Sequence, residues 1–309
     1  MAFEKVSYAG WEQCVRLSND QIELIATQEV GPRIIRLGFR GEKNVFGEIK
    51  ADLGKKGGEE WRIYGGHRLW HAPEARPRTY YPDNQPVNVS GEENLLVLVQ
   101  PEEETTHLEK RMILEMDEQE NHVKVTHQIF NRGLWEIEFA AWALSVMCPG
   151  GFAIVPQEPF ASHQELLTPV RPVVLWGYTN MSDPRFRWGQ KYVTLRQDPQ
   201  ATSPNKAGFG NTQGWAAYWV ENFVFLKLFS YQEEMIYPDF GSTVEVFTNQ
   251  DFLELETLSP LRKVSPREAV EHVEHWFLFR MEEPFQDEDS FIDATLLPLV
   301  DRAWKKIKA

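Results

Sequence analysis

The chain has 309 residues, of which 42% are hydrophobic and 13% aromatic, so it can build a substantial folded core. Its formal net charge of −14 argues against nucleic acid or an anionic membrane as a partner, because both are bound through clustered Lys and Arg. No run reaches the ~18 apolar residues of a membrane span, and no basic segment followed by an apolar one marks the N-terminus, so we expect a cytoplasmic location.

Short β-branched segments recur along the chain and are bounded by Gly, Pro, Asn or Asp. Examples are residues 22–27, 33–37, 95–99 and 123–130. Many strands with little helical periodicity predict an all-β fold, an antiparallel β-sandwich or barrel. No linker divides the chain, so we expect a single domain over residues 1–309. The two cysteines, Cys14 and Cys148, do not indicate a disulfide framework.

Residues 64–74 concentrate groups that recognise ligands. Two adjacent glycines allow a sharp turn or a close backbone approach, and His67, Arg68 and Trp70 follow at once. An aromatic face stacks on the C–H face of a pyranose, while Arg and His hydrogen-bond its hydroxyls. The segment therefore predicts a sugar site. The alternative is a Gly-Gly turn with a packed Trp70 and a surface Arg68.

Two further residues are candidates for ligand contact in the aromatic segments between residues 214 and 241. Lys227 shares a strand face with Phe225 and Phe229, so its head group either reaches a pocket or extends to solvent. Asp239 follows Tyr237-Pro238 and is either a ligand for a hydroxyl or a turn former.

Glu254 and Glu256 alternate with leucines in the predicted strand 252–258. Because strand side chains alternate in direction, Leu253 and Leu255 face a core while both glutamates share the opposite face, about 7 Å apart. This face is either exposed to solvent or contributes catalytic groups to a site. At the C-terminus, Leu296, Val300, Trp304 and Ile307 recur at helical spacing and predict a short helix on the sandwich edge.

The run from Leu255 to Leu261 (LETLSPL), a turn with Pro266, and then residues 272–279 (HVEHWFLF) resemble the C-terminal part of the galactose mutarotase (aldose 1-epimerase) superfamily. The resemblance implies a galactose mutarotase-like supersandwich and interconversion of sugar anomers without cofactor or metal. It implies that Glu256 is the catalytic base and that Arg68 binds substrate with His67 beside it in the same pocket.

The chain departs from the family pattern at the general acid. Trp142 stands near the position where the family has a histidine, and residues 80–84 (YYPDN) replace a second histidine motif. His67 and, more remotely, His163 are the candidates for this role. Arg267 also replaces the usual glycine in the turn before residue 272. The chain is closest to a divergent branch of the superfamily.

Metal and cofactor sites are not indicated. His272 and His275 fall on opposite faces of one strand, and Pro73 argues against a helix that would join His67 to His71. No phosphate-cradling loop, dinucleotide fingerprint or nucleophile elbow occurs. We therefore predict no metal site and no cofactor.

Three functions stay open. The first is a sugar 1-epimerase with Glu256 as base, and the second is a non-catalytic carbohydrate-binding protein that uses the same cleft. The third, a glycoside-cleaving enzyme with Glu254 and Glu256, is the least favoured, because carboxylates side by side on one strand would not flank a scissile bond. The partner is a small sugar or sugar derivative. Arg33 and Arg68 belong to a set of arginines that either clamp a phosphate or uronate or lie on the surface. The sequence predicts no oligomeric state.

Overall fold

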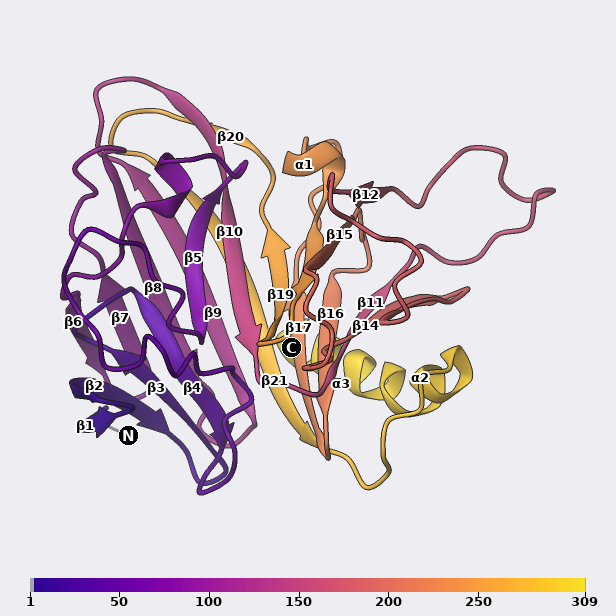
Figure 1. Cartoon of the computed structure of the whole chain (residues 1–309), viewed down its shortest axis with the longest axis horizontal. Coiled ribbons are helices and arrows are strands. Elements are labelled where there is room, and N and C mark those ends of the chain that lie inside the picture. The colour runs from indigo at the N-terminus through magenta and orange to yellow at the C-terminus, as the bar shows by residue number, and fades with distance from the viewer. Residues whose placement is uncertain (1–2, 309) are drawn as a thin grey trace.

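The computed structural model describes residues 3–308 and consists of two large antiparallel β-sheets packed face to face (Figure 1). In sheet order, the first sheet contains β1 (Glu4–Tyr8), β2 (Trp11–Ser18), β3 (Ile22–Thr27), β4 (Arg33–Phe39), β5 (His67–Ala72), β10 (Ile137–Met147), β19 (Leu253–Leu258), β18 (Val244–Thr248), β15 (Asn205–Phe209) and β12 (Val173–Leu175), with β20 (Arg262–Val264) paired to β10.

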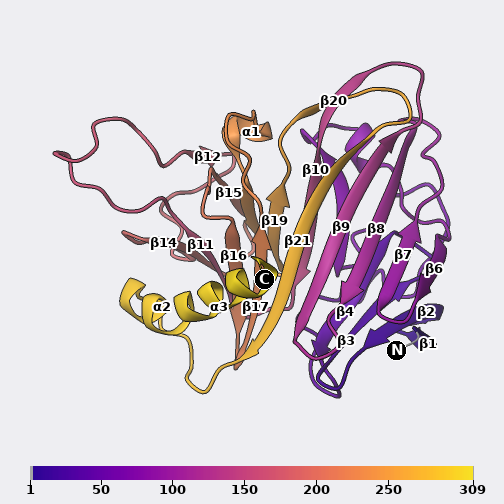
Figure 2. The same cartoon turned by 180° about the vertical axis from the view of Figure 1, so that it is seen from behind.

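The second sheet forms the other layer, which Figure 2 shows from behind. In sheet order it contains β13 (Phe186–Trp188), β14 (Tyr192–Arg196), β11 (Phe152–Pro156), β16 (Trp215–Val220), β17 (Phe223–Phe229), β21 (Ala269–Arg280), β9 (His122–Asn131), β8 (Leu108–Met116), β7 (Leu95–Val99) and β6 (Asn88–Glu92). These two layers confirm the predicted all-β antiparallel sandwich.

Few helices accompany the sheets: a 3₁₀ turn (Arg78–Tyr80), α1 (Pro238–Gly241), α2 (Asp289–Thr295) and α3 (Leu297–Lys308). The predicted C-terminal helix is confirmed, but its predicted place on the sandwich edge is wrong. Phe291, Ile292 and Val300 pack against Trp215, Trp219 and other apolar side chains of β16, β17 and β21. Helices α2 and α3 therefore cover the outer face of the second sheet around β16 and β17 (Figure 2), because this part of the face is apolar and needs a cover.

The main core lies between the two sheets. Strand β19 contributes Leu253 and Leu255 to it, β5 contributes Leu69, and Trp276 of β21 meets them from the second sheet. By the alternation of a strand, the neighbours of these residues point to the outer face of the first sheet. Arg68, Glu254 and Glu256 are such neighbours. The alternation of side chains along β5 and β19 therefore places core residues on one face and candidate site residues on the other.

The acidic segment from Glu102 to Glu104 contains one buried residue. The run from Glu102 to Glu104 resembles a solvated hairpin tip, yet Glu103 is fully buried. Its carboxylate pairs with the ammonium of the equally buried Lys110 and accepts from Thr106. A charged residue is tolerated there because it is paired and hydrogen-bonded.

No helix of residues 3–308 is long and apolar enough to cross a membrane.

Candidate functional site

A pocket of about 280 Å³ opens on the outer face of the first sheet. Its aromatic lining is Trp61, Trp70, Tyr80, Trp142, Tyr178, Phe247 and Phe252, and its charged lining is Arg68, Arg76, Lys206, Glu74 and Glu254. This volume is just below the ~300–1,000 Å³ range of pockets for drug-sized ligands, which suits a ligand of monosaccharide size.

The backbone register brings distant segments to the floor of this pocket. Arg68 is paired across strands with Leu144, Leu144 with Glu256, and Glu256 with Glu245. Residues opposite each other in antiparallel strands share a face. The guanidinium of β5 and the carboxyl groups of β19 and β18 therefore stand in one row on the outer face.

Lys206 of β15 lies at the centre of the charged part of the site. Its Nζ donates a hydrogen bond to Glu256 Oε2 (3.1 Å) and lies 2.7 Å from Glu245 Oε2. The ammonium also sits 4.7 Å from the ring centroids of both Trp142 and Trp176, within the range of cation–π attraction. Lys206 thus connects the pocket wall to two buried carboxyl groups.

Glu256 itself is fully buried and does not line the pocket. Its Oε2 accepts hydrogen bonds from Trp142 Nε1 (2.9 Å) and from Lys206, both of which do line it. Its Oε1 has no hydrogen-bond partner among the described residues. The predicted base therefore lies directly beneath the pocket, covered by an indole and an ammonium group.

Burial and neighbouring charges shift the protonation of this cluster. Burial raises the pKa of Glu256, Lys206 opposes the rise and Glu254 adds to it. Burial also raises the pKa of Glu245 well above its ordinary value, and the nearby Glu256 and Asp239 add to it. Burial alone would lower the pKa of Lys206, but the two glutamates raise it above its ordinary value. Lys206 consequently remains an ammonium ion at neutral pH.

Arg68 and Trp70, both predicted to bind substrate, line the pocket. The Arg68 guanidinium lies 4.4 Å from the Trp70 ring centroid, and its Nη2 is 2.8 Å from Glu254 Oε1 without an aligned hydrogen bond. Arg68 Nε and Nη1 are buried and have no hydrogen-bond partner in the described part of the chain. Buried donors of this kind usually have a partner, so they mark where a polar ligand would bind.

Two other predicted residues adjoin the pocket without lining it. Asp239 occupies the turn of α1 at a left-handed φ of 49°, and burial raises its pKa. It interacts with Glu245 and Lys206 electrostatically from the side of that turn. Arg33 is paired with Arg68 across β4 and β5, but its guanidinium binds Asp83 (2.6 Å) and the carbonyl oxygen of Gly65 (2.8 Å). Its Nη1 and Nη2 are thus committed within the protein, while its Nε has no hydrogen-bond partner among the described residues.

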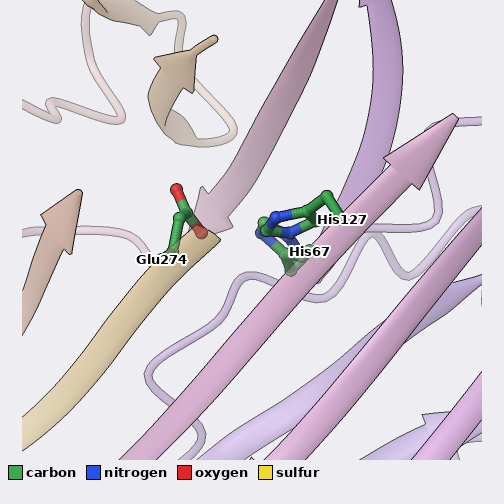
Figure 3. Close-up of side chains that lie close together, drawn as sticks. All are labelled: His67, His127 and Glu274. Carbon is green, nitrogen blue, oxygen red and sulfur yellow. The ribbon is translucent and has the colours of Figure 1, made fainter. Parts of the chain in front are cut away.

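His67 and Lys227 lie on the other side of the first sheet, in the interior of the sandwich. His67 is the strand neighbour of Arg68 and therefore points away from the pocket. The structure thus separates His67 from Arg68 and places it with His127 and Glu274 (Figure 3). Lys227 Nζ donates to Glu274 Oε1 (2.9 Å) and to the carbonyl oxygen of Leu255 (3.2 Å). All four side chains are fully buried.

The hydrogen bonds of this interior cluster are mutually consistent. His127 Nδ1 donates to the carbonyl oxygen of His272 (3.0 Å), so its Nε2 accepts from His67 Nε2, 2.7 Å away. Ser145 then donates to His67 Nδ1 (2.8 Å). Glu274 accepts from Lys227, Thr257 and Trp276. The cluster links strands of both sheets through partnered polar groups.

His67, His127 and Glu274 also offer three ligand atoms within 4.8 Å of one another. Two imidazole nitrogens bound tetrahedrally to Zn²⁺ would stand about 3.3 Å apart, given Zn–N bonds of about 2.0–2.1 Å. The observed 2.7 Å is a hydrogen-bond distance, and Lys227 already provides the cation beside Glu274. The donors fit a hydrogen-bonded network, and the absence of a metal site stays a prediction.

Several residues of the site have no clear signal in the sequence. Lys206 stands in the short strand Asn205–Phe209 without alternating charges, and only strand pairing brings it to Glu256. Glu245 could be recognised in the sequence as a candidate, because it alternates with Val244 and Val246 in the strand that precedes the Glu256 strand. Trp61 and Tyr178 come from irregular segments whose position depends on tertiary packing.

Comparisons with solved structures define the class of fold. Similar structures include a galactose mutarotase-like protein from Lactobacillus casei ATCC 334 (TM-score 0.57, 9% identity, 86% of this chain and 100% of that one). A galactose mutarotase-like protein from Clostridium acetobutylicum matches with a TM-score of 0.55 and 11% identity over 90% of this chain and 98% of that one.

A galactose mutarotase related enzyme from Lactobacillus acidophilus matches with a TM-score of 0.57 and 8% identity over 89% and 100% of the two chains. No family model matches the sequence, and no curated protein sequence does so. The chain thus has the galactose mutarotase-like fold with a divergent sequence, as its resemblance to that superfamily predicted.

We predict that breaking the interior ion pair is strongly destabilising. Lys227→Met leaves the Glu274 carboxylate buried without its cation, so the free energy of unfolding in urea should fall by about 3–5 kcal/mol. The double variant Lys227→Met/Glu274→Leu should be more stable than Lys227→Met alone. Lys124→Met, which breaks an exposed pair with Glu115, is the matched control and should cost under about 1 kcal/mol. A loss of less than about 1 kcal/mol for Lys227→Met would show that the buried Glu274 carboxylate does not need this cation.

We also predict pronounced destabilisation by mild acid. Six histidines have pKa values lowered mainly by burial: His67, His71, His122, His127, His272 and His275. The pKa of His272 falls to about 3 and that of His122 to about 4. Below pH ~6.5 the unfolded chain therefore binds more protons than the folded one, and stability falls with pH.

Each such histidine contributes up to about 1.4 kcal/mol per pH unit. Urea unfolding at pH 7, 6 and 5 should show a steep decline in the free energy of unfolding. A value that stays constant between pH 7 and 5 would show that these imidazoles accept protons in the folded state.

Proposed function

We propose that the pocket binds a monosaccharide-sized carbohydrate and that the protein interconverts the anomers of this sugar, with Glu256 as the base. The fold supports a sugar as the class of ligand, because the similar structures are named as galactose mutarotase-like proteins. The assignment of a reaction to this chain rests on its own residues.

The observation that carries the proposal is the set of buried polar atoms without partners around one aromatic pocket. Among the described residues, Trp61 Nε1, Arg68 Nε and Nη1, and Glu256 Oε1 make no hydrogen bond. A sugar offers hydroxyl groups to such atoms and a C–H face to the rings of Trp70 and Trp142. A purely apolar ligand would leave these donors and acceptors unpaired, which is energetically costly.

Glu256 has the properties that a base for this reaction needs. Anomer interconversion begins when a base takes the proton of the anomeric hydroxyl, and a carboxylate performs this best when its pKa lies near the working pH. Burial raises the pKa of Glu256 in that direction. Trp142 and Lys206 hold Oε2, so Oε1 is the atom that would accept the proton.

Binding without turnover is the second candidate, and the burial of Glu256 favours it. Because Trp142 and Lys206 cover the carboxyl group, a sugar reaches it only if one of these side chains moves as the ligand enters. Cleavage of glycosides by Glu254 and Glu256 has less support, since both side chains leave the same strand on the same face.

The test of the proposed function is Glu256→Gln, which removes the base and keeps the side-chain volume. Polarimetry of freshly dissolved pure anomers of glucose, galactose and mannose should show acceleration by the wild-type protein. The variant should lose that acceleration by at least about 100-fold, the usual size of a general-base contribution. Its sugar affinity, measured by calorimetry, should change by less than about 10-fold.

Glu115→Gln on β8 of the second sheet is the matched control and should leave the rate unchanged. If the wild-type protein binds a sugar but accelerates no anomer exchange, the non-catalytic alternative holds. If no sugar of the panel binds, the proposal is overturned.

A further inference from the structure

The pocket offers few groups that can deliver a proton. No histidine is among its lining residues in the part of the chain that the structure describes. Arg68 and Arg76 remain protonated in proteins and cannot act as acids. Tyr80 already donates its hydroxyl proton to Glu74, which leaves the Tyr178 hydroxyl and the Lys206 ammonium as proton donors in the lining. Lys206 is the cationic lining residue that can lose a proton.

The position of Lys206 leaves it at least one donor for a ligand. An ammonium group has three N–H donors in tetrahedral arrangement. One of them is bonded to Glu256 Oε2 at 3.1 Å, while Glu245 Oε2 lies 2.7 Å from Nζ as an ion pair without an aligned hydrogen bond. The two indoles of Trp142 and Trp176 hold the ammonium in place from its sides. At least one N–H is therefore left for an oxygen atom in the pocket.

We propose that Lys206 is the catalytic acid of this site and donates its proton to the ring oxygen of the sugar while Glu256 accepts the proton of the anomeric hydroxyl. The inference rests on the proposed function and assigns the acid for that reaction. It replaces His67, which lies on the opposite side of the sheet.

The step balances within the site. The anomeric O–H bond breaks and its proton goes to Glu256, while the bond between the anomeric carbon and the ring oxygen breaks with its electron pair on the ring oxygen. That oxygen takes a proton from Lys206 Nζ, which gives the open-chain aldehyde. Lys206 then regains a proton from Glu256 along their 3.1 Å hydrogen bond. Rotation about the adjacent C–C bond and reversal of these steps close the ring on the other face.

A lysine as the acid predicts a pH profile of kcat/KM that differs from the profile expected for a histidine. The adjacent glutamates keep the pKa of Lys206 above its ordinary value, so the acid stays protonated in alkaline solution. The wild-type kcat/KM should therefore remain level from about pH 7 to pH 9. A histidine with an ordinary pKa of ~6.5 would lose its proton in that range.

The experiment compares Lys206→Met and Lys206→Arg with the wild-type protein, by polarimetry for kcat and by calorimetry for sugar affinity. Lys206→Met should lower kcat by at least about 100-fold. Lys206→Arg keeps the positive charge but cannot donate a proton, so it should bind sugar within about 10-fold of wild type and still lack turnover. Lys124→Met on the second sheet is the control for an unrelated lysine, and circular dichroism checks folding.

Turnover restored by Lys206→Arg would show that Lys206 supplies only charge, and this result would overturn the inference. A kcat of Lys206→Met within 10-fold of wild type, or an activity that falls above pH 7, would do so as well. These results require an active wild-type protein. Failure of the proposed function itself is distinct, because the wild-type protein would then accelerate no anomer exchange.

Discussion

One buried ammonium group, that of Lys206, stands between two glutamates that face each other across strands β18 and β19. Without this cation, Glu245 and Glu256 would share a desolvated site as like charges, and one of them would have to remain neutral. The lysine connects them to the pocket because it also lines the wall where a ligand would lie. The protonation of the proposed base and the shape of the pocket therefore depend on the same side chain.

A second buried lysine lies on the reverse side of the same strands. Lys227 pairs with Glu274 in the interior, and its ammonium also bonds to the backbone of β19. Thr257, the neighbour of Glu256, donates to Glu274. Strand β19 thus carries polar residues with tightly held partners on both faces. Buried ion pairs contribute little net stability compared with apolar packing, but losing one partner is costly. Such a strand is held rigidly, which suits a site whose donors must be preorganised.

Strand alternation explains both what the sequence predicts and where it fails. The alternating pattern of residues 253–258 is sufficient to place Leu253 and Leu255 in the core and both glutamates on the other face. The orientation of residues 67–70 is harder to predict, because His67 and Arg68 are both polar and either could face a ligand. The second sheet determines this orientation, because it provides His127 as the hydrogen-bond partner of His67. The orientation of Lys227 is also hard to predict from the sequence, since its partner Glu274 is 47 residues away.

The site also depends on pairings that no local pattern contains. Lys206 meets Glu256 only because β15, β18 and β19 are neighbours in the sheet, and Tyr178 and Trp61 reach the pocket from irregular segments. Arg68 and Trp70 were predictable because a Gly-Gly turn and a cluster of recognition groups stand together in the sequence. The resemblance to the mutarotase superfamily predicts the fold, whereas Trp142, near the position expected for the family histidine, means that the resemblance assigns no general acid.

The central claim is that a sugar occupies the pocket between Trp70 and Lys206. A crystal structure of the protein soaked with glucose, galactose, mannose and their 6-phosphates tests it most directly. We expect a pyranose against the indole of Trp70, with an oxygen atom within hydrogen-bond distance of Lys206 Nζ and hydroxyls on the free donors of Arg68. A pocket without sugar at saturating concentrations, or a sugar bound only at another surface, would contradict the account.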